Sequence, residues 1–262
     1  MRVTRIRLSW LALLLAGTVL RAQAPAPADH SLPWVGHAAE MEAHLRTADI
    51  VRLEDVGTGV TQPRRAYLQP DTPFGSIVWK PLRPGRYRGY WESYKSEIAA
   101  YELDKLLEMH MVPPAVEREV DGEKGAAIMW IDGTRSVKQM GGKIPTGPTF
   151  GKPVRMMQLF DNLIGNPDRN AGNILIDASN HVILIDHSRA FIEDRKLPFK
   201  FERVDADLWT KVTALTRERL TARLSHWLDD VAIEAMLARR DEIAKGVDDL
   251  VKRRGAAAVI IP

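Results

Sequence analysis

The sequence predicts an α+β fold of two lobes, a small β-rich amino-terminal lobe with one bridging helix and a mainly helical carboxyl-terminal lobe. Short apolar segments separated by turn-forming residues fill most of residues 38–132 and indicate strands. One long amphipathic segment, Glu92 to Met109, interrupts them. Beyond Phe191 apolar residues recur at three- and four-residue spacing, which is typical of packed helices. We therefore assign the two lobes to residues 38–132 and 133–262.

Residues 1–24 have the pattern of a secretory signal peptide. Basic residues at the start precede an apolar run from Leu8 to Leu20, and Ala22-Gln23-Ala24 matches a small-x-small cleavage site. The apolar run is short for a transmembrane helix. We expect an exported protein, periplasmic or secreted, in which residues 25–37 form a linker. A retained signal anchor is the alternative.

Composition excludes several classes of function. The chain has 262 residues and a formal net charge of +3, but four arginines and no acids lie in residues 1–24, so 33 basic residues remain against 34 acidic ones. A nucleic-acid partner is therefore not expected, because phosphate-backbone binding needs clustered positive charge. The chain has no cysteine, which excludes disulfides, thiolate catalysis and cysteine-based metal sites.

The amino-terminal lobe begins with a predicted helix from Ala38 to Ala48 and a strand from Ile50 to Val60. Gly57 and Gly59 permit a tight turn, whose backbone N–H groups could approach phosphates. An ordinary hairpin is the alternative. Further strands are predicted over Arg64 to Leu68 and Ser76 to Trp79, the latter followed by Lys80.

The predicted helix from Glu92 to Met109 ends before Val112-Pro113-Pro114, because a residue that precedes proline is disfavoured in the α conformation. Glu97 and Glu102 lie on opposite flanks of its apolar face. Periodicity alone does not decide which of them pairs with Lys80.

A hairpin is predicted from strands Ala115 to Val120 and Ala126 to Ile131, with residues 121–125 as the turn. It leads into a Gly-containing connector between the lobes. In a nucleotide-binding arrangement, this connector would contact the base through backbone amides, and its carboxylate would meet the ribose. The alternative is an ordinary linker with a buried tryptophan. The residues concerned are Met129, Trp130, Ile131 and Asp132.

The carboxyl-terminal lobe is predicted to start with a Gly- and Pro-rich loop, Gly141 to Pro153, and a helix, Val154 to Leu163. Its remaining helices are amphipathic. They are predicted over Ala206 to Val212, Arg217 to Leu228 and Val231 to Lys252.

Between these helices the sequence predicts a polar site beside a β-hairpin. Ile174-Leu175-Ile176 and Val182-Ile183-Leu184-Ile185 flank a turn-forming segment, so their pairing brings Asn173 and Asp186 to one end. Asp168 lies in the loop just before. Such oxygen ligands suit Mg²⁺, and D-x-x-x-x-N followed by a metal-binding Asp is the order found in phosphoryl-transfer sites. The alternative is that these residues only form turns.

Residues 159–169 (LFDNLIGNPDR) and 184–191 (LIDHSRAF) resemble the secretory-pathway kinases of the family with sequence similarity twenty. Their relatives, the four-jointed kinases and the type II phosphatidylinositol 4-kinases, carry similar stretches. Residues 97–107 and the following Val112-Pro113-Pro114 resemble the lobe-bridging helix of these kinases and the strand after it. The similarity covers roughly Asp49 to Phe191. His-Arg-Asp and Ala-Pro-Glu elements are absent, so the resemblance is to atypical kinases only.

This resemblance implies a two-lobed protein-kinase-like fold and a role for each site residue. Asp168 would orient and deprotonate the acceptor hydroxyl, while Asn173 and Asp186 would hold Mg²⁺ or Mn²⁺. Lys80 would hold the phosphates of ATP, and Glu97 would fix Lys80. Departures from the family include the absence of cysteine, the Asn at position 173 and the His at position 187.

The resemblance implies transfer of the γ-phosphoryl group of ATP to a protein hydroxyl. A lipid or small-molecule kinase on the same fold is one alternative, and a non-catalytic nucleotide- or protein-binding module is the other. The expected partners are the nucleotide and an unidentified protein or lipid acceptor. A phospholipid acceptor predicts an exposed apolar or basic patch, and the sequence shows no strong one.

Overall fold

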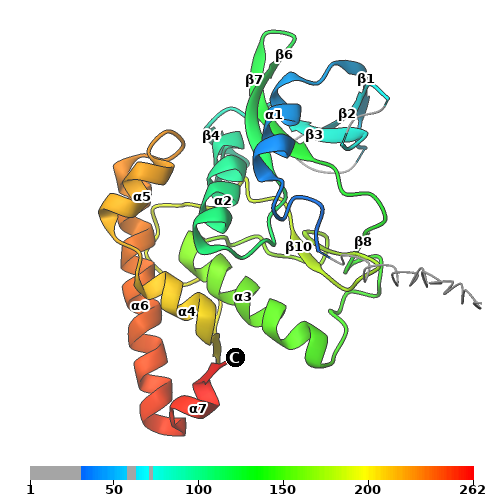
Figure 1. The fold of residues 1–262 in the computed structure, drawn as a ribbon. Coiled ribbons are helices and arrows are strands. Elements are labelled where there is room, and N and C mark those ends of the chain that lie inside the picture. Colours follow the sequence, from blue (N-terminus) through cyan, green and yellow to red (C-terminus); the bar gives the residue numbers. More distant parts are fainter. Residues whose placement is uncertain (1–30, 58–62, 71–72) are drawn as a thin grey trace, which may run out of the picture. The chain divides into compact units, whose positions relative to one another are not determined.

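An antiparallel sheet forms the amino-terminal lobe (Figure 1). The computed structural model describes residues 31–57, 63–70 and 73–262, and within them this sheet has five strands in the order β1-β2-β3-β7-β6. The strand order places β3, which carries Lys80, at the centre. The strands are β1 (Ile50–Asp55), β2 (Arg64–Leu68), β3 (Ser76–Lys80), β6 (Ala115–Val120) and β7 (Glu123–Met129).

The two faces of this sheet contact different cores. Ala127 and Met129 of β7 pack in a cluster with helix α1 (Ala38–Thr47), while Ala126 and Ile128 pack in the cluster that contains helix α2 (Tyr94–Leu107). This is the alternation that a strand buried on both faces must show. Leu32 and Trp34, in the turns before α1, are buried in the α1 cluster.

Helix α2 begins two residues later than predicted. The Ser93 hydroxyl accepts a hydrogen bond from the Lys95 N–H (3.0 Å) and caps the helix, whereas Glu92 belongs to a short hairpin that the sequence did not predict. This hairpin pairs β4 (Gly85–Tyr87) with β5 (Tyr90–Glu92). At its other end, α2 stops at Glu108, which has φ 52°.

The predicted turn between β6 and β7 is wrong in length. The actual loop is Asp121-Gly122, with φ 53° and 81°, and Gly125 lies inside β7. A Cβ atom at position 125 would lie 2.5 Å from the Lys80 carbonyl oxygen, so glycine permits close approach of β3. Gly125, predicted as a turn residue, is therefore a strand residue that is required for packing.

The carboxyl-terminal lobe begins with a longer helix than predicted. Helix α3 spans Pro148–Ile164, so the predicted loop to Pro153 is wrong beyond Gly147. Pro148 occupies the first turn, where proline is favoured, and Pro153 is accommodated inside the helix. Proline and glycine therefore misled the prediction here, because the buried face of α3 outweighs their low helix propensity.

The remaining elements follow the predicted order. A smaller sheet has the order β10-β9-β8, and its β9–β10 hairpin has the predicted register, with Leu184 opposite Ile174. Short strands β8, β11 and β12 and helix α7 were not predicted. None of the helices in the described residues is long and apolar enough to cross a membrane. The elements are β8 (Arg135–Ser136), β9 (Ile174–Ile176), β10 (Val182–Leu184), β11 (Val204–Asp205), α4 (Ala206–Thr213), α5 (Arg217–Leu224), α6 (Asp230–Arg254), α7 (Ala256–Val259) and β12 (Ile260–Ile261).

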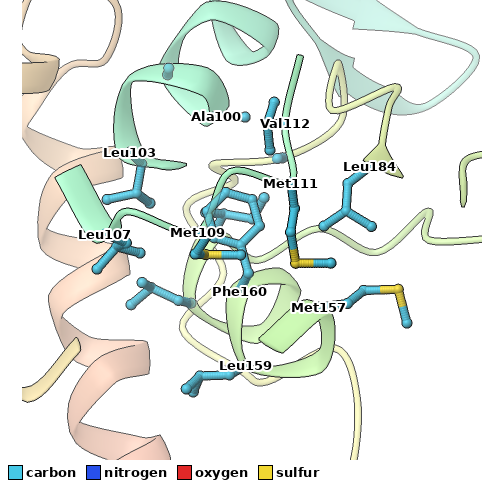
Figure 2. Packing of buried hydrophobic residues seen from close by; sticks show 14 of the residues in the cluster. Ala100, Leu103, Leu107, Met109, Met111, Val112, Met157, Leu159, Phe160 and Leu184 are labelled. Atoms are coloured by element: carbon cyan, nitrogen blue, oxygen red, sulfur yellow. The ribbon is translucent and has the colours of Figure 1, made fainter. Parts of the chain in front are cut away.

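The main core joins α2 to the carboxyl-terminal lobe. Figure 2 shows Leu103 and Leu107 of α2 beside Met109 and Met111, with Phe160 of α3 and other buried side chains around them. Helix α2 also contacts α4 and α5. It therefore shares one hydrophobic core with the carboxyl-terminal lobe.

Candidate active site

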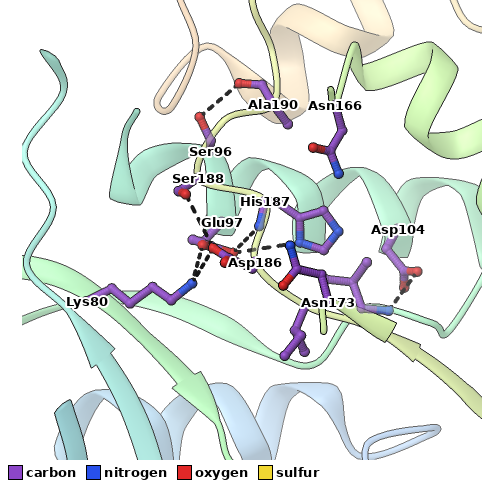
Figure 3. A network of polar contacts seen from close by, with 12 residues as sticks. Lys80, Ser96, Glu97, Asp104, Asn166, Asn173, Asp186, His187, Ser188 and Ala190 are labelled. Atoms are coloured by element: carbon purple, nitrogen blue, oxygen red, sulfur yellow. Dashed lines mark hydrogen bonds and ion pairs between the residues drawn. The ribbon is translucent and has the colours of Figure 1, made fainter. Parts of the chain in front are cut away.

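Lys80 lies between two carboxylates that come from different parts of the chain (Figure 3). Its Nζ atom is 2.7 Å from Glu97 Oε1 on α2 and 2.8 Å from Asp186 Oδ1, which follows β10. Lys80 and Glu97 are buried, while the Asp186 side chain is 35% exposed. Three residues that the sequence singled out therefore converge at one point between the sheet and the hairpin.

The electrostatics of this cluster keep Lys80 and Glu97 charged. Burial lowers the pKa of Lys80, but the carboxylates of Asp186 and Glu97 outweigh it and raise the pKa above its usual range. Burial raises the pKa of Glu97, yet Lys80 and the hydrogen bond from His187 hold it well below the usual value. A fixed ammonium group is thus present between the Glu97 and Asp186 carboxylates at physiological pH.

Glu102 has other partners. Its carboxylate is 3.0 Å from Lys105 Nζ and 2.6 Å from Arg223 Nε of α5. In this structure Glu97, and not Glu102, pairs with Lys80, which settles the choice that helical periodicity left open.

The β9–β10 hairpin brings Asn173 and Asp186 to the same end, as its spacing predicts. The Ile185 N–H donates to the Asn173 carbonyl (3.1 Å), and Asn173 Nδ2 donates to the Asp168 carbonyl (3.0 Å). The second bond fixes the amide and leaves Asn173 Oδ1 without a hydrogen bond among the described residues. Asp186 has φ 60°, an uncommon conformation for a residue other than glycine, and it turns the chain out of β10.

Arg169 holds this loop together, a role that the sequence did not reveal. Its Nε and Nη2 atoms donate to the two oxygens of the buried Asp161 carboxylate (2.9 and 3.0 Å). Its Nη1 atom donates to the carbonyls of Asn173 (2.7 Å) and Ile185 (2.8 Å). One guanidinium thus ties α3, the loop and the end of β10, and only a buried arginine supplies so many directed donors.

His187 completes the same network. The Nη2 atom of Arg169 is 2.9 Å from His187 Nε2, and the backbone N–H of His187 donates to Glu97 Oε2 (2.9 Å). Arginine has only donors, so Nε2 accepts and the ring proton lies on Nδ1. Burial lowers the pKa of His187, and its contact with Glu97 only partly opposes this, so the ring is neutral at pH 7.

The Asp168 carboxylate is half-exposed and pairs with an arginine. Arg189 Nη1 lies 3.2 Å from Asp168 Oδ2, and Arg189 Nε donates to Glu92 Oε1 (2.8 Å). Asn166 Oδ1 accepts from the Asp168 N–H (3.1 Å) and fixes the backbone. Arg189 was not singled out in the sequence, because its two partners lie 21 and 97 positions away.

In the connector between the lobes, some of the backbone N–H groups expected to contact the base are already hydrogen-bonded within the protein. The N–H of Met129 donates to the Pro114 carbonyl (2.9 Å) and that of Trp130 to the Ser76 carbonyl (3.2 Å). Trp130 Nε1 and Arg65 Nη2 both donate to Asp132 Oδ1. Among the described contacts Ile131 makes no backbone N–H bond. Its amide, and the exposed Asp132 carboxylate, remain the candidates for base and ribose contacts.

The glycine turn is described only in part. Gly57 has φ 68° and has open space around it, as a loop that approaches a ligand requires. Gly59 lies outside the described residues.

The oxygen donors near Asp186 suit a hard cation. Within the described residues there is no group of three or more His, Cys, Asp or Glu side chains that could hold a metal ion alone. The available donors are one carboxylate, Asp186, and one amide, Asn173, which is a sparse set. Mg²⁺ and Mn²⁺ sites in phosphoryl-transfer enzymes are completed by substrate phosphates and water, so this set fits them.

A pocket of about 370 Å³ lies elsewhere, between α3, the 137–144 segment and Phe199-Lys200. It touches Asp161 and Arg169 but not Lys80, Glu97 or Asp186. Arg169 already uses its donors within the protein, and the pocket contains none of the three residues of the Lys80 cluster.

Solved structures share this fold. A Fam20 protein of hydra, in complex with sugar, superposes with a TM-score of 0.65 at 18% identity and covers 86% of this chain and 92% of its own. Two structures of the Golgi casein kinase, one with Mn and ADP bound, give a TM-score of 0.64 at 15% and 16% identity. They cover 86% of this chain and 78% of their own. The fold is that of an atypical kinase.

A sequence family supports the same relationship. The model for phosphatidylinositol 3- and 4-kinase matches residues 147–243, from the start of α3 into α6. No curated protein sequence matches the chain. The expected kinase-like fold and the resemblance to secretory-pathway and phosphatidylinositol kinases are thereby confirmed.

Proposed function

We propose that this chain is an ATP-dependent kinase of the atypical type, which transfers the γ-phosphoryl group to a protein hydroxyl. The observation that carries the proposal is the placement of Lys80 Nζ between Glu97 (2.7 Å) and Asp186 (2.8 Å). A Lys–Glu pair beside a metal-binding Asp is the arrangement that kinases need for transfer.

Each residue has a distinct role in this proposal. Lys80 binds nucleotide phosphates, and Glu97 holds it in place. Asp168, half-exposed at the cleft, orients and deprotonates the acceptor hydroxyl. Asn173 and Asp186 hold Mg²⁺ or Mn²⁺, which neutralises charge on the phosphates when bound. The Mn and ADP found in the Golgi casein kinase support this choice of cofactors.

The nucleotide base and ribose are assigned to the connector. Among the described residues the Ile131 N–H and Asp132 Oδ2 have no hydrogen bond and are assigned to the base and the ribose, while Met129 and Trp130 form the wall. Gly57 and Gly59 are assigned to phosphate binding through their backbone N–H groups. Residues 1–24 direct the chain out of the cytoplasm, so the reaction takes place in the periplasm or outside the cell.

A lipid hydroxyl is the second candidate acceptor. The phosphatidylinositol 3- and 4-kinase model matches the whole segment that contains Asp168, Asn173 and Asp186. The casein kinase structures favour a protein acceptor instead. Acceptor choice depends on the surfaces around the site rather than on these residues, so both acceptor classes belong in the test.

The proposal is tested with protein that starts at residue 25 and labelled ATP, with Mg²⁺ or Mn²⁺, against casein, phosphatidylinositol vesicles and the protein itself. We expect metal-dependent label transfer, which EDTA abolishes. Asp186→Ala should lose metal-dependent nucleotide binding and transfer. Asp168→Ala should bind nucleotide normally but transfer at least about a hundredfold more slowly, the range of general-base catalysis.

Two results contradict the proposal. Nucleotide binding without transfer to any acceptor favours a non-catalytic binding module, and a lack of metal-dependent nucleotide binding excludes a kinase. Arg195→Ala is the matched control, since Arg195 is exposed and has no ion pair or side-chain hydrogen bond among the described residues.

A further inference from the structure

The β4–β5 hairpin exposes an unusual set of side chains. Among the described residues, five large hydrophobic side chains are exposed, and three of them are Tyr87 (37%), Tyr90 (54%) and Trp91 (44%) on this hairpin. The other two are single valines, Val51 and Val231. Exposed hydrophobic side chains that cluster in one place indicate a binding surface, whereas single exposed ones do not.

The same hairpin is basic. Residues 81–91 contain Arg83, Arg86 and Arg88 and no acid, although the chain after residue 24 has a small acidic excess. Arg83 lies 3.8 Å from Glu123 at the surface. Arg86 and Arg88 have no ion pair among the described residues, so their charge is available to a partner.

The geometry of the hairpin presents these groups at an exposed tip. Arg86 pairs across the strands with Trp91, and Tyr87 pairs with Tyr90, so each face carries aromatic surface. The loop is Arg88-Gly89, with φ 49° and 90°, the type I′ arrangement in which Asn or Gly is normally preferred at the first position. An arginine thus occupies the tip despite a backbone that favours other residues.

The hairpin lies at the entrance to the proposed active site. The Tyr90 ring is 4.4 Å from the Arg189 guanidinium carbon, and Glu92 at the end of β5 binds Arg189, which in turn contacts Asp168. One arginine side chain therefore separates the hairpin from the residue proposed to meet the acceptor.

We propose that the β4–β5 hairpin docks on an anionic phospholipid surface. Tryptophan and tyrosine rings favour the headgroup region of a membrane, and arginines add attraction to anionic lipids. A stable protein partner usually needs about 800 Å² and 20 or more residues on each side, whereas the hairpin from Gly85 to Glu92 has eight residues. The membrane is the occupant that so small an aromatic and basic surface fits.

Membrane binding itself does not depend on the proposed kinase activity, whereas delivery of a membrane-borne acceptor to Asp168 does. No strong membrane signal is evident in the sequence after residue 24, because aromatic and basic residues spaced along a loop have no periodicity. In the structure, the β4–β5 hairpin brings these aromatic and basic residues together.

The test uses protein that starts at residue 25, so that the apolar run in residues 8–20 does not bind lipid. This protein contains residues 31–262, which form one compact unit. Co-sedimentation without nucleotide compares vesicles of phosphatidylcholine with vesicles containing phosphatidylglycerol. We expect binding to the anionic vesicles, weakened by salt. Each arginine near such a surface contributes about fivefold, so Arg86→Gln/Arg88→Asn should lose about 25-fold.

The variants are chosen to leave the fold intact. Asn at position 88 suits the type I′ turn. An unfolding temperature equal to that of the parent shows that the Arg86→Gln/Arg88→Asn variant is folded. Trp91→Ala should lose binding several-fold, whereas Val231→Ala and Arg195→Ala should bind like the parent. Asp186→Ala should also bind vesicles like the parent, which separates docking from catalysis.

Three outcomes overturn the proposal: equal binding to neutral and anionic vesicles, hairpin variants that bind like the parent, or no vesicle binding at all. Preferential binding of poly-glutamate over anionic vesicles also overturns it and assigns the hairpin to an acidic protein partner instead.

Discussion

Arg189 Nη1 lies 3.2 Å from Asp168 Oδ2, so the proposed catalytic base is held by an arginine from the segment after Asp186, the proposed metal ligand. The same guanidinium donates to Glu92 in the amino-terminal lobe. The orientation of the Asp168 carboxylate therefore depends on the contact between the lobes as well as on its own loop.

Replacement of Arg189 should affect turnover more than nucleotide binding. We expect Arg189→Ala to lower kcat at least tenfold while KM for ATP changes less than twofold, because Arg189 contacts the base and not Lys80. Arg189→Lys should recover part of the loss. Steady-state kinetics with the Arg195→Ala control measure this, and a KM effect as large as the kcat effect would contradict a positioning role.

Glu97 and Glu102 should differ sharply. Glu97→Gln removes a charge from the buried cluster around Lys80, and we expect at least tenfold slower transfer, with a comparable or larger loss for Lys80→Ala. Glu102→Gln disturbs only contacts with Lys105 and Arg223. Transfer by this variant should stay within threefold of the parent, because neither contact involves Lys80, Asp168 or Asp186. An equal loss from both glutamine variants would contradict the assignment.

Asp104 should make stability pH-dependent near neutrality. Burial raises the pKa of Asp104 from 3.8 to about 7, although the N–H groups of Met111, Val112 and His110 donate to its carboxylate and oppose the rise. Between about pH 4 and 7 the folded carboxyl keeps a proton that the unfolded chain releases. The folded state therefore binds more protons, and its stability falls as pH rises through this window.

The measurement is urea unfolding of the parent and of Asp104→Asn from pH 5 to pH 8. The parent's free energy of unfolding, relative to the variant, should fall by up to about 1.4 kcal/mol per pH unit below pH 7. A difference that does not change with pH would show that the three N–H donors hold Asp104 ionised.

Gly125→Ala should destabilise the sheet beside Lys80. The added Cβ would lie 2.5 Å from the Lys80 carbonyl oxygen and 2.9 Å from Pro81 Cα, so β3 must move. We expect roughly 1–3 kcal/mol loss of stability and slower transfer. Gly75→Ala, which has open space and no positive φ, is the matched control and should leave both unfolding and transfer unchanged.

Sequence periodicity was sufficient for most of the fold. The β9–β10 hairpin and α2 were predicted because each has its own local pattern and, in α2, a proline stop. The short strands β8 and β12 could not be predicted, since two residues carry no periodicity and pair only once the lobe is folded. Pro153 and Gly125 led to the opposite error. Each is a residue type that usually ends a helix or strand, but here it lies inside α3 or β7 because of packing.

The residues of the site likewise fall into two groups, those that the sequence predicts and those that it does not. Asp168, Asn173 and Asp186 were found because their chemistry lies within 19 consecutive residues. Arg169 and Arg189 were missed as functional residues, because their roles exist only through partners on α3, β10 and β5. Arg169 follows Asp168, and an arginine next to an aspartate is common in sequences. Nothing in the neighbouring residues indicates that the Arg169 side chain is buried.

The core that α2 shares with the carboxyl-terminal lobe also includes residues of the sheet that carries Lys80. Because Leu103, Leu107 and Phe160 pack together, Glu97 is anchored to the same body as Asp186. Lys80 lies on the sheet, whose Ala126 and Ile128 pack in this same core, while its other face shares a second core with α1. Lys80 and Glu97 are therefore joined through one continuous core, so a substitution that loosens the packing of α2 is expected to disturb the Lys80–Glu97 pair as well as the fold.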